Sequence, residues 1–188
     1  MNNLALMQYA AARLEIEQVL IRYARGVDRQ DWISVKSAYH DNATDHHGEF
    51  QGNIDDFIQY LVQRHANIEQ SIHFITNVTV ELVGDSAALV ESYYLCQQRL
   101  KSAEGMEKAF GKVFVSDDET VQLSASGRYI DRFERRDNVW RIADRKVAFD
   151  VLTATATPLG GGLGIQLLRS RRDAEDVLMQ ERALLGFK

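Results

Sequence analysis

The feature that most constrains the fold is a change in hydrophobic period partway along the chain. Before Ser71, apolar side chains recur at helical spacing, first in the series Ile16, Val19, Leu20, Tyr23 and Val27. From Ser71 onward the period falls to two, which is the spacing of a strand with one buried face. Helices followed by a run of antiparallel strands predict an α+β fold and not a doubly wound parallel sheet.

The spacing predicts three helices ahead of the strands. The first contains the series above and places Asp28 at the border of its apolar stripe, near the helix end. The second covers residues 32–39 with Asp31 as its N-cap, and the third follows Asn53 and reaches His65. Between these two helices, residues 41–52 predict a polar turn with a short strand or hairpin.

Four strands are predicted, over residues 73–82, 87–100, 120–134 and 139–151, and Asp137-Asn138 suits a tight hairpin between the last two. A strongly curved antiparallel sheet folded over a helix encloses a pocket along its inner face. We expect this α+β domain to occupy residues 1–157. Residues 158–188 then form a glycine-rich hinge and an amphipathic helix at 171–185 that packs on the domain or on a partner subunit. The charged loop at 102–118 is expected to act as a flap.

Composition limits the class of partner. A formal net charge of −5 argues against nucleic acid, because phosphate binding needs a clustered positive field. No apolar run approaches the roughly 20 residues needed to span a bilayer, and the N-terminus does not resemble a secretion signal. Cys96 is the single cysteine, which excludes an intrachain disulfide. We therefore expect a cytoplasmic protein with no nucleic-acid and no membrane partner.

Three segments resemble one known family. Residues 21–32 (IRYARGVDRQDW), 73–77 (HFITN) and 129–140 (YIDRFERRDNVW) are similar to signatures of the SnoaL-like proteins. That family belongs to the nuclear-transport-factor-two-like superfamily and has a conical α+β fold. Within it, the chain resembles scytalone dehydratase, the bile acid dehydratase and the hexachlorocyclohexane dehydrochlorinase. The resemblance implies elimination of water or HCl without a cofactor, by an Asp at the end of the first helix beside a His that begins a strand.

The resemblance also assigns roles to residues of this chain. Asp28 matches the family aspartate through the Asp-Trp pair that follows it at 31–32, and His73 matches the family histidine through the Phe-Ile pair at 74–75. These two are the implied catalytic residues. Substrate-binding positions are implied for Tyr23, His47, Gln97, Tyr129 and Arg145. Tyr23 and Arg145 match site residues of the bile acid enzyme, and the other three lie near site positions of scytalone dehydratase.

An Asp-His pair suits β-elimination, in which a weakly acidic proton is removed and a neighbouring group is expelled. A neutral imidazole, with an ordinary pKa of about 6.5, is mostly unprotonated at neutral pH and can accept the proton. A carboxylate bonded to its other nitrogen fixes the tautomer and stabilises the imidazolium that forms. We expect His73 to be the base and Asp28 to orient it. Arg145, Tyr23 or Tyr129 would bond a carbonyl and stabilise enolate charge.

Each residue of the pair also has an ordinary structural interpretation. Taken singly, Asp28 is a common helix-end aspartate and His73 a common sheet histidine, and only their joint context favours catalysis. The run Asp45-His46-His47 suggests a metal, but adjacent strand residues point to opposite faces, so the two histidines do not easily share one ion. We expect His47 to face the pocket and no metal to be bound. Residues 160–162 (GGG) lack the Lys-Ser/Thr of a phosphate loop, so no nucleotide cofactor is predicted.

The leading hypothesis is a lyase that acts on a small hydrophobic, hydroxylated ring substrate. A ketosteroid-isomerase-like isomerase is an alternative, but such enzymes use a carboxylate base deep in the cone, and only Asp131 is a candidate. A non-catalytic ligand-binding or oligomerisation module is a third possibility, and it would not need the Asp-His pair. Because the exposed face of such a sheet usually packs against another subunit, a homodimer or homotrimer is expected.

Overall fold

The computed structural model describes residues 2–101, 119–158 and 168–187. Three helices occupy the first part of the chain, namely α1 (Asn3–Arg29), α2 (Trp32–Ser37) and α3 (Ile54–His65). Two short strands, β1 (Tyr39–His47) and β2 (Phe50–Asn53), lie between α2 and α3. Four long strands follow, and the helix α5 comes last: β3 (Ile68–Val83), β4 (Ala87–Leu100), β5 (Glu119–Arg136), β6 (Val139–Pro158) and α5 (Val177–Leu184).

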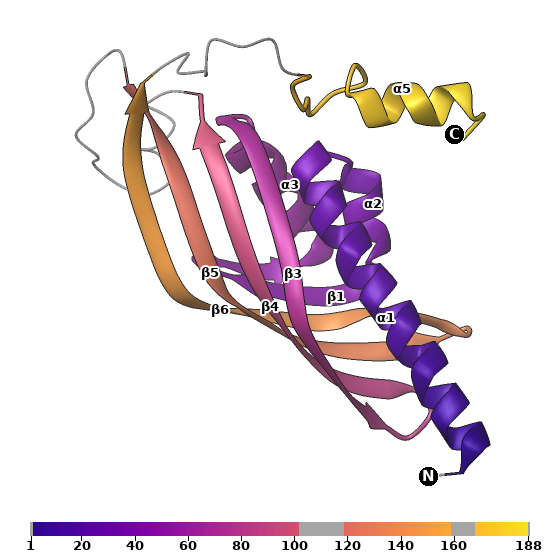
Figure 1. Ribbon diagram of the computed structural model, residues 1–188. Helices are drawn as coiled ribbons and strands as arrows, with labels where there is room; N and C mark the ends of the chain where they lie inside the picture. The colour runs from indigo at the N-terminus through magenta and orange to yellow at the C-terminus, as the bar shows by residue number, and fades with distance from the viewer. Residues whose placement is uncertain (1, 102–118, 159–167, 188) are drawn as a thin grey trace.

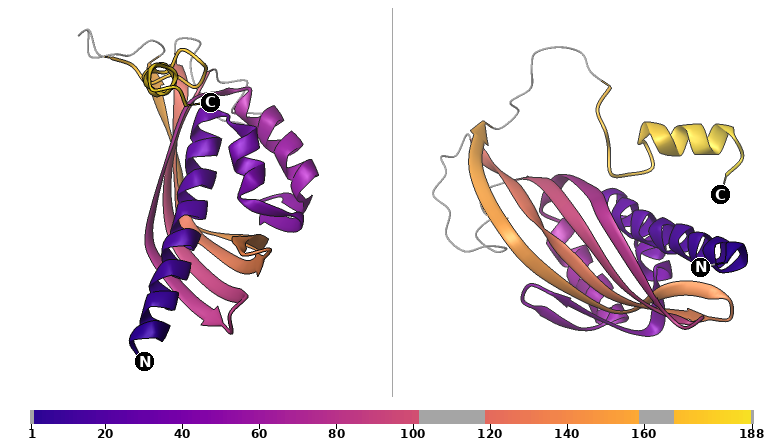
Figure 2. Two further views of the ribbon diagram at one scale, coloured as in Figure 1. Left: turned by 90° about the vertical axis from the view of Figure 1, so that its right-hand side faces the viewer. Right: turned by 60° about the horizontal axis from the view of Figure 1, so that its bottom comes forward.

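The strands form one six-stranded sheet in the order β2-β1-β6-β5-β4-β3. Neighbouring strands run antiparallel except for β1 and β6, which are parallel. The sheet is strongly curved, and it is not closed because its edge strands β2 and β3 do not pair (Figure 1). The helices α1, α2 and α3 lie on one side of it (Figure 2). This arrangement confirms the predicted α+β class. The sheet is not purely antiparallel, because β1 and β6 pair in parallel.

Local capping explains where the helices begin. The side chains of Asn2, Asp31 and Asn53 each accept a hydrogen bond from a backbone N–H one turn further on, at 2.8, 3.0 and 3.0 Å. The last two confirm the predicted caps of α2 and α3. The helix α2 is shorter than predicted, because Tyr39 already belongs to β1. Tyr39 is buried and its hydroxyl donates to Oδ2 of Asp45 at 2.7 Å, so tertiary packing overrides the helical spacing here.

The turns between the long strands follow from local backbone chemistry. Asp137 and Asn138 adopt positive φ angles of 51° and 62°, as a primed hairpin turn requires, and this confirms the predicted turn between β5 and β6. Gly127 lies at a register shift between the same strands. A Cβ atom there would come within 2.1 Å of the backbone oxygen of Ala148, so only glycine fits this close approach.

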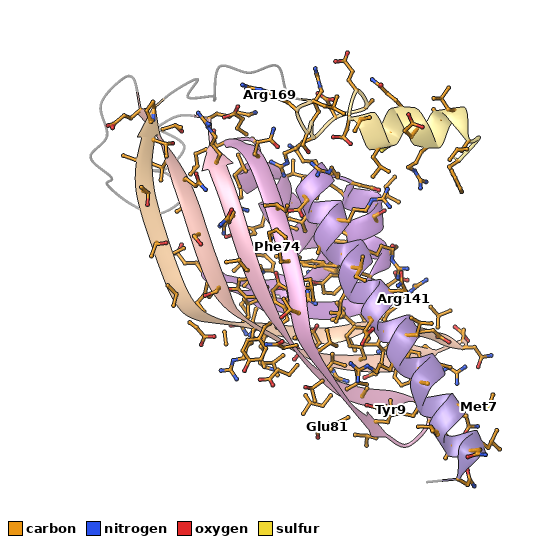
Figure 3. All side chains as sticks on the ribbon, viewed as in Figure 1. Met7, Tyr9, Phe74, Glu81, Arg141 and Arg169 are labelled. Carbon is orange, nitrogen blue, oxygen red and sulfur yellow. The ribbon has the colours of Figure 1, made fainter. Side chains whose placement is uncertain are left out.

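The hydrophobic core lies between the helices and the concave face of the sheet, where Figure 3 shows side chains filling the space. It contains the predicted apolar stripe of α1 together with residues of α3 and the inward positions of the strands: Ile16, Val19, Leu20, Tyr23, Val27, Phe57, Leu61, Val90, Tyr94, Tyr129 and Phe133. The outward positions of β3 remain open, and Phe74, labelled in Figure 3, is about half exposed. The inner face of the sheet is therefore the side on which a buried site can form.

The last described segment, residues 168–187, runs past the helical layer and ends in α5 (Figure 1). The helix begins at Val177, later than the predicted residue 171, after Asp176 accepts the backbone N–H of Leu178 at 3.0 Å. None of the residues of α5 is buried. The expected flap at 102–118 and the glycine-rich residues 159–164 lie outside the described residues. The described ranges contain no helix long and apolar enough to cross a membrane.

Candidate active site

A cavity of about 590 Å³ lies between the concave face of the sheet and the helices α1 and α3. Aromatic side chains form much of its wall, among them Tyr23, Tyr60, Tyr94, Tyr129 and Phe149. The other polar and ionisable side chains of the lining are His47, Glu49, Arg64, His65, His73, Cys96 and Gln98. A mostly apolar cavity of a few hundred Å³ with a small number of polar groups is the usual form of a small-molecule site.

Asp28 and His73 are joined by short hydrogen bonds, and of the two His73 lines the cavity. Asp28 is buried near the end of α1, and its Oδ1 lies 2.7 Å from Nδ1 of His73 on β3. Its Oδ2 accepts the backbone N–H of the same histidine at 2.8 Å. The hydroxyl of Ser71 donates to Oδ1 at 3.0 Å. The carboxylate thus orients both the main chain and the ring of His73, and leaves Nε2 as the ring nitrogen that does not contact Asp28.

The charge state of this pair differs from the neutral imidazole expected from the sequence. Burial favours the neutral ring, but the neighbouring Cys96 and Asp28 side chains outweigh it and raise the pKa of His73 to about 10. Burial also opposes the charged form of Asp28, yet hydrogen bonds from His73 and Ser71 lower the pKa of its carboxyl. At neutral pH the pair is therefore an aspartate–imidazolium ion pair. His73 has to lose a proton before it can act as a base.

Three of the predicted substrate-binding residues line the cavity, namely Tyr23, His47 and Tyr129. The rings of the two tyrosines meet edge to face, with centroids 5.9 Å apart. Burial lowers the pKa of His47 to about 3, so its ring is neutral at physiological pH. His46, the next residue along β1, is not part of the lining, as strand alternation predicts. Within the described residues, no three His, Cys, Asp or Glu side chains are placed to hold a metal ion.

Gln97 does not line the cavity, which corrects its expected position. It is exposed on β4, whereas its neighbour Gln98 is buried and lines the cavity. The side-chain amide of Gln98 donates to Oγ of Ser71 at 3.4 Å, and Ser71 in turn bonds Asp28. Side chains alternate along a strand, so an error of one residue in an approximate alignment moves the side chain to the other face.

Arg145 does not reach the cavity either. Its Nε and Nη2 donate to the two carboxylate oxygens of Asp131 at 2.7 and 2.6 Å, and both side chains are fully buried. The guanidinium carbon lies 4.2 Å from the ring centroid of Tyr23 and 4.1 Å from that of Tyr129. Arg145 therefore supports the two cavity tyrosines instead of bonding a substrate carbonyl, contrary to the sequence-based expectation.

Sequence reasoning missed two cavity residues on β4. Cys96 pairs directly with His73 in the β3–β4 register, and their side chains interact. Gln98 follows two positions later on the same face. The alternation of buried and exposed residues along β4 was the available signal, because it assigns Tyr94, Cys96 and Gln98 to one face once His73 is known to point inward.

Comparison with known proteins assigns the chain to a family. Among solved structures, a candidate scytalone dehydratase from Novosphingobium aromaticivorans aligns with a TM-score of 0.66 and 15% identity, over 86% of this chain and 99% of its own. A type 2 hexachlorocyclohexane dehydrochlorinase aligns with a TM-score of 0.67 and 20% identity, over 85% of this chain and 99% of its own. At these identities the likeness shows a shared fold. A search of curated proteins by sequence gave no match. Residues 8–146 match the model of the SnoaL-like domain, and the chain therefore belongs to the SnoaL-like family.

Proposed function

We propose that this protein is a lyase that eliminates water or a similar leaving group from a small hydrophobic, hydroxylated ring substrate without a cofactor. The observation that carries the proposal is the Asp28–His73 pair, in which Oδ1 and Nδ1 lie 2.7 Å apart and His73 lines the cavity. The aromatic lining suits a ring-containing substrate. The similar structures include a candidate scytalone dehydratase and a dehydrochlorinase, which supports an elimination.

His73 is the proton-transfer group in this proposal. In its neutral form, Nε2 accepts a proton from a carbon next to the substrate carbonyl, and the carbonyl oxygen takes up the negative charge as an enolate. The enolate then forms the carbon–carbon double bond as the neighbouring carbon–oxygen bond breaks. The imidazolium returns the proton to the departing hydroxide, so that the products are an alkene and water. Asp28 keeps Nδ1 protonated and stabilises the imidazolium during this sequence.

Tyr94 is the group that we assign to the substrate carbonyl in place of Arg145. It lines the cavity, is about 5% exposed, and stacks on Tyr129 with ring centroids 4.7 Å apart. Its buried hydroxyl has no hydrogen-bond partner within the described part of the chain. Burial raises its pKa above the ordinary value for tyrosine, so the hydroxyl keeps its proton and can donate it to an enolate oxygen. A ligand carbonyl would satisfy a group that is costly to leave unpaired.

The direct test is an elimination assay on a panel of β-hydroxy carbonyl compounds with one to three rings. Wild-type protein should produce the conjugated alkene, detected by its ultraviolet absorbance and by the loss of one water in mass spectrometry, and His73→Ala should not. Compounds that raise the melting temperature of the protein without being converted would support the non-catalytic ligand-binding alternative.

The pH dependence of elimination should follow the raised pKa of His73. Because the base is the neutral ring, kcat/KM of the wild type is expected to rise about tenfold per pH unit from pH 7 until the pKa of about 10 is approached. In Asp28→Asn the anion that favours the imidazolium is removed, so the inflection should move down towards the ordinary value of about 6.5. Initial rates between pH 6 and 10, with circular dichroism to monitor folding, measure both profiles. A wild-type plateau beginning near pH 6.5 would contradict the ion pair.

The carboxylate that the sequence suggests as the isomerase base does not line the cavity, whose one carboxylate among the described residues is Glu49. Asp131, the carboxylate suggested by the sequence, is fully buried, bonded to Arg145 and absent from the cavity lining. Asp45 is also buried and accepts the hydroxyl of Tyr39 at 2.7 Å. Burial raises the pKa of Asp45 to about 7, but its side chain does not line the cavity. We therefore prefer elimination with His73 as the base.

We also propose that the protein is a homodimer or homotrimer. Large apolar side chains remain exposed at outward positions of β3 and β4: Ile72, Phe74, Leu89, Tyr93 and Leu95. Phe74 and Leu95 are direct partners across the two strands, and exposed apolar side chains grouped in this way usually mark an interface. Light scattering after size exclusion should give two or three times the 21.4 kDa of one chain, and Phe74→Glu combined with Leu95→Glu should give a monomer. A wild-type monomer would contradict this proposal.

A further inference from the structure

Arg172, a residue of the C-terminal segment, is buried against the end of α1. The guanidinium of Arg172 donates to three backbone carbonyls: Nε to that of Asp28 at 2.7 Å, Nη2 to that of Val27 at 3.0 Å and Nη1 to that of Ile68 at 2.9 Å. Its Nη2 also lies 2.6 Å from Nδ1 of His65. One side chain thereby joins the last turn of α1, the start of β3 and the end of α3.

These contacts lie at the C-terminal end of α1. The last carbonyls of a helix have no partner within the helix, and an arginine side chain can satisfy them while its charge complements the negative end of the helix dipole. Asp28 lies in this final turn. Its main chain accepts a hydrogen bond from Arg172, and its carboxylate accepts hydrogen bonds from His73 and Ser71. The guanidinium therefore holds the backbone from which the carboxylate projects.

The surrounding segment is held against the domain by further contacts. Arg29 Nη1 donates to the backbone oxygen of Arg171 at 3.1 Å, and the side-chain amide of Gln70 donates to the backbone oxygen of Ser170 at 2.8 Å. Both partners immediately precede Arg172 in the sequence. Arg169, labelled in Figure 3, marks the start of the same segment. The side chain of Arg172 is thus placed by contacts on the two elements that also carry Asp28 and His73.

We propose that Arg172 is a positioning residue for the Asp28–His73 pair, acting through the main chain of Asp28. The segment that carries Arg172 lies beyond residues 8–146, the part that matches the SnoaL-like domain. The contacts of Arg172 with the three backbone carbonyls, here called the clamp, are therefore additional to the matched domain. The catalytic consequence of the clamp rests on the proposed lyase function. The geometry of the pair can be measured without any turnover, so failure of the clamp and failure of the lyase proposal are distinguishable.

The titration of His73 separates positioning from a simple charge effect. The titratable and charged groups near the pair are Cys96 on β4, His47 on β1, His65 on α3 and Arg172 itself, together with Arg25 and Arg29 of α1, which line a small pocket with the pair. Removing a nearby cation would by itself raise the pKa of His73, because like charges disfavour its protonated form. Loosening the contact with Asp28 would lower that pKa, because the carboxylate stabilises the imidazolium. The two effects have opposite signs.

The experiment is an NMR titration of the histidine rings in the full-length protein, with the His73 signals assigned by comparison with His73→Gln. In Arg172→Ala, the pKa of His73 is expected to fall by at least about one unit towards 6.5. Arg172→Lys keeps the positive charge but not the planar three-carbonyl contact, and should also lower this pKa. If the alanine variant does not fold, the lysine variant decides the question alone.

The matched control is Arg171→Ala, which removes the same charge one residue away. The Arg171 side chain is about half exposed and pairs with Asp173 and Glu175 inside the segment, so this variant should leave the His73 titration unchanged. An unchanged or raised pKa in both folded Arg172 variants would overturn the proposal. So would an equal fall of the pKa in the Arg171 control.

Discussion

Replacing His73 with alanine is expected to lower kcat for elimination by about two to four orders of magnitude, the usual contribution of a general acid–base group. The side chain lines the cavity, and in the proposed reaction it both accepts the substrate proton and returns it to the leaving group. The Kd of a non-reactive substrate analogue should change only a few-fold, because most of the cavity wall is aromatic or aliphatic. Stopped-assay kinetics and calorimetric binding measure the two quantities separately.

His46→Ala is the matched control for this loss. It removes the same type of side chain from β1, next to His47, but from a residue that does not line the cavity. Its kcat and its Kd for the analogue should equal those of the wild type. If His73→Ala and His46→Ala had equal activity, His73 would not be the base. A parallel loss of kcat and binding in His73→Ala would instead assign it a ligand-binding role.

The sequence predicts those parts of the fold that depend on local chemistry. Asp31 and Asn53 cap their helices as expected, because an N-cap needs only its own side chain and a backbone N–H one turn away. Asp137 and Asn138 form the expected hairpin turn for a similarly local reason. The end of α2 was not predictable in this way, since Tyr39 leaves the helix for a hydrogen bond within the buried core.

In the candidate site, too, local sequence context predicts some residues, while the tertiary structure determines the positions of others. Asp28 and His73 come from a helix end and a strand start that carry recognisable neighbours, and they meet at hydrogen-bond distance. The glutamine of the cavity is Gln98 and not Gln97, because a one-residue uncertainty on a strand exchanges the two faces. The position of Arg172 depends on the three-dimensional path of the C-terminal segment. The spacing of apolar residues along the sequence does not predict that path.

The ion pair between Arg145 and Asp131 lies inside the core. Both side chains are fully buried and joined by two hydrogen bonds, and Asp45 is a third buried ionisable group nearby. Burial raises the pKa of Asp131 even beside the guanidinium. Removing either partner leaves the other charge without compensation, which is far more costly than losing an exposed pair. The stability of this fold should therefore be sensitive to Arg145 in a pH-dependent way.

Arg145→Met is expected to lower the free energy of unfolding by about 3–5 kcal/mol at pH 7, measured by urea denaturation. Without the guanidinium, Asp131 has a folded-state pKa raised further above its unfolded value, so stability is retained below the unfolded pKa and lost as pH rises through the raised one. The loss should accordingly be smaller at pH 4 than at pH 7. The double variant Arg145→Met/Asp131→Leu should recover much of the loss, since no charge of the pair remains.

Lys146→Met is the control, because this neighbour on β6 pairs with Asp144 through an exposed side chain and should cost no more than about 1 kcal/mol. If Arg145 bonded the substrate directly, Arg145→Met would reduce turnover in a protein of nearly unchanged stability. That outcome would contradict its placement behind Tyr23 and Tyr129. The expected outcome is instead a large, pH-dependent loss of stability that the second substitution relieves, because the role of Arg145 is to neutralise a carboxylate that the core cannot solvate.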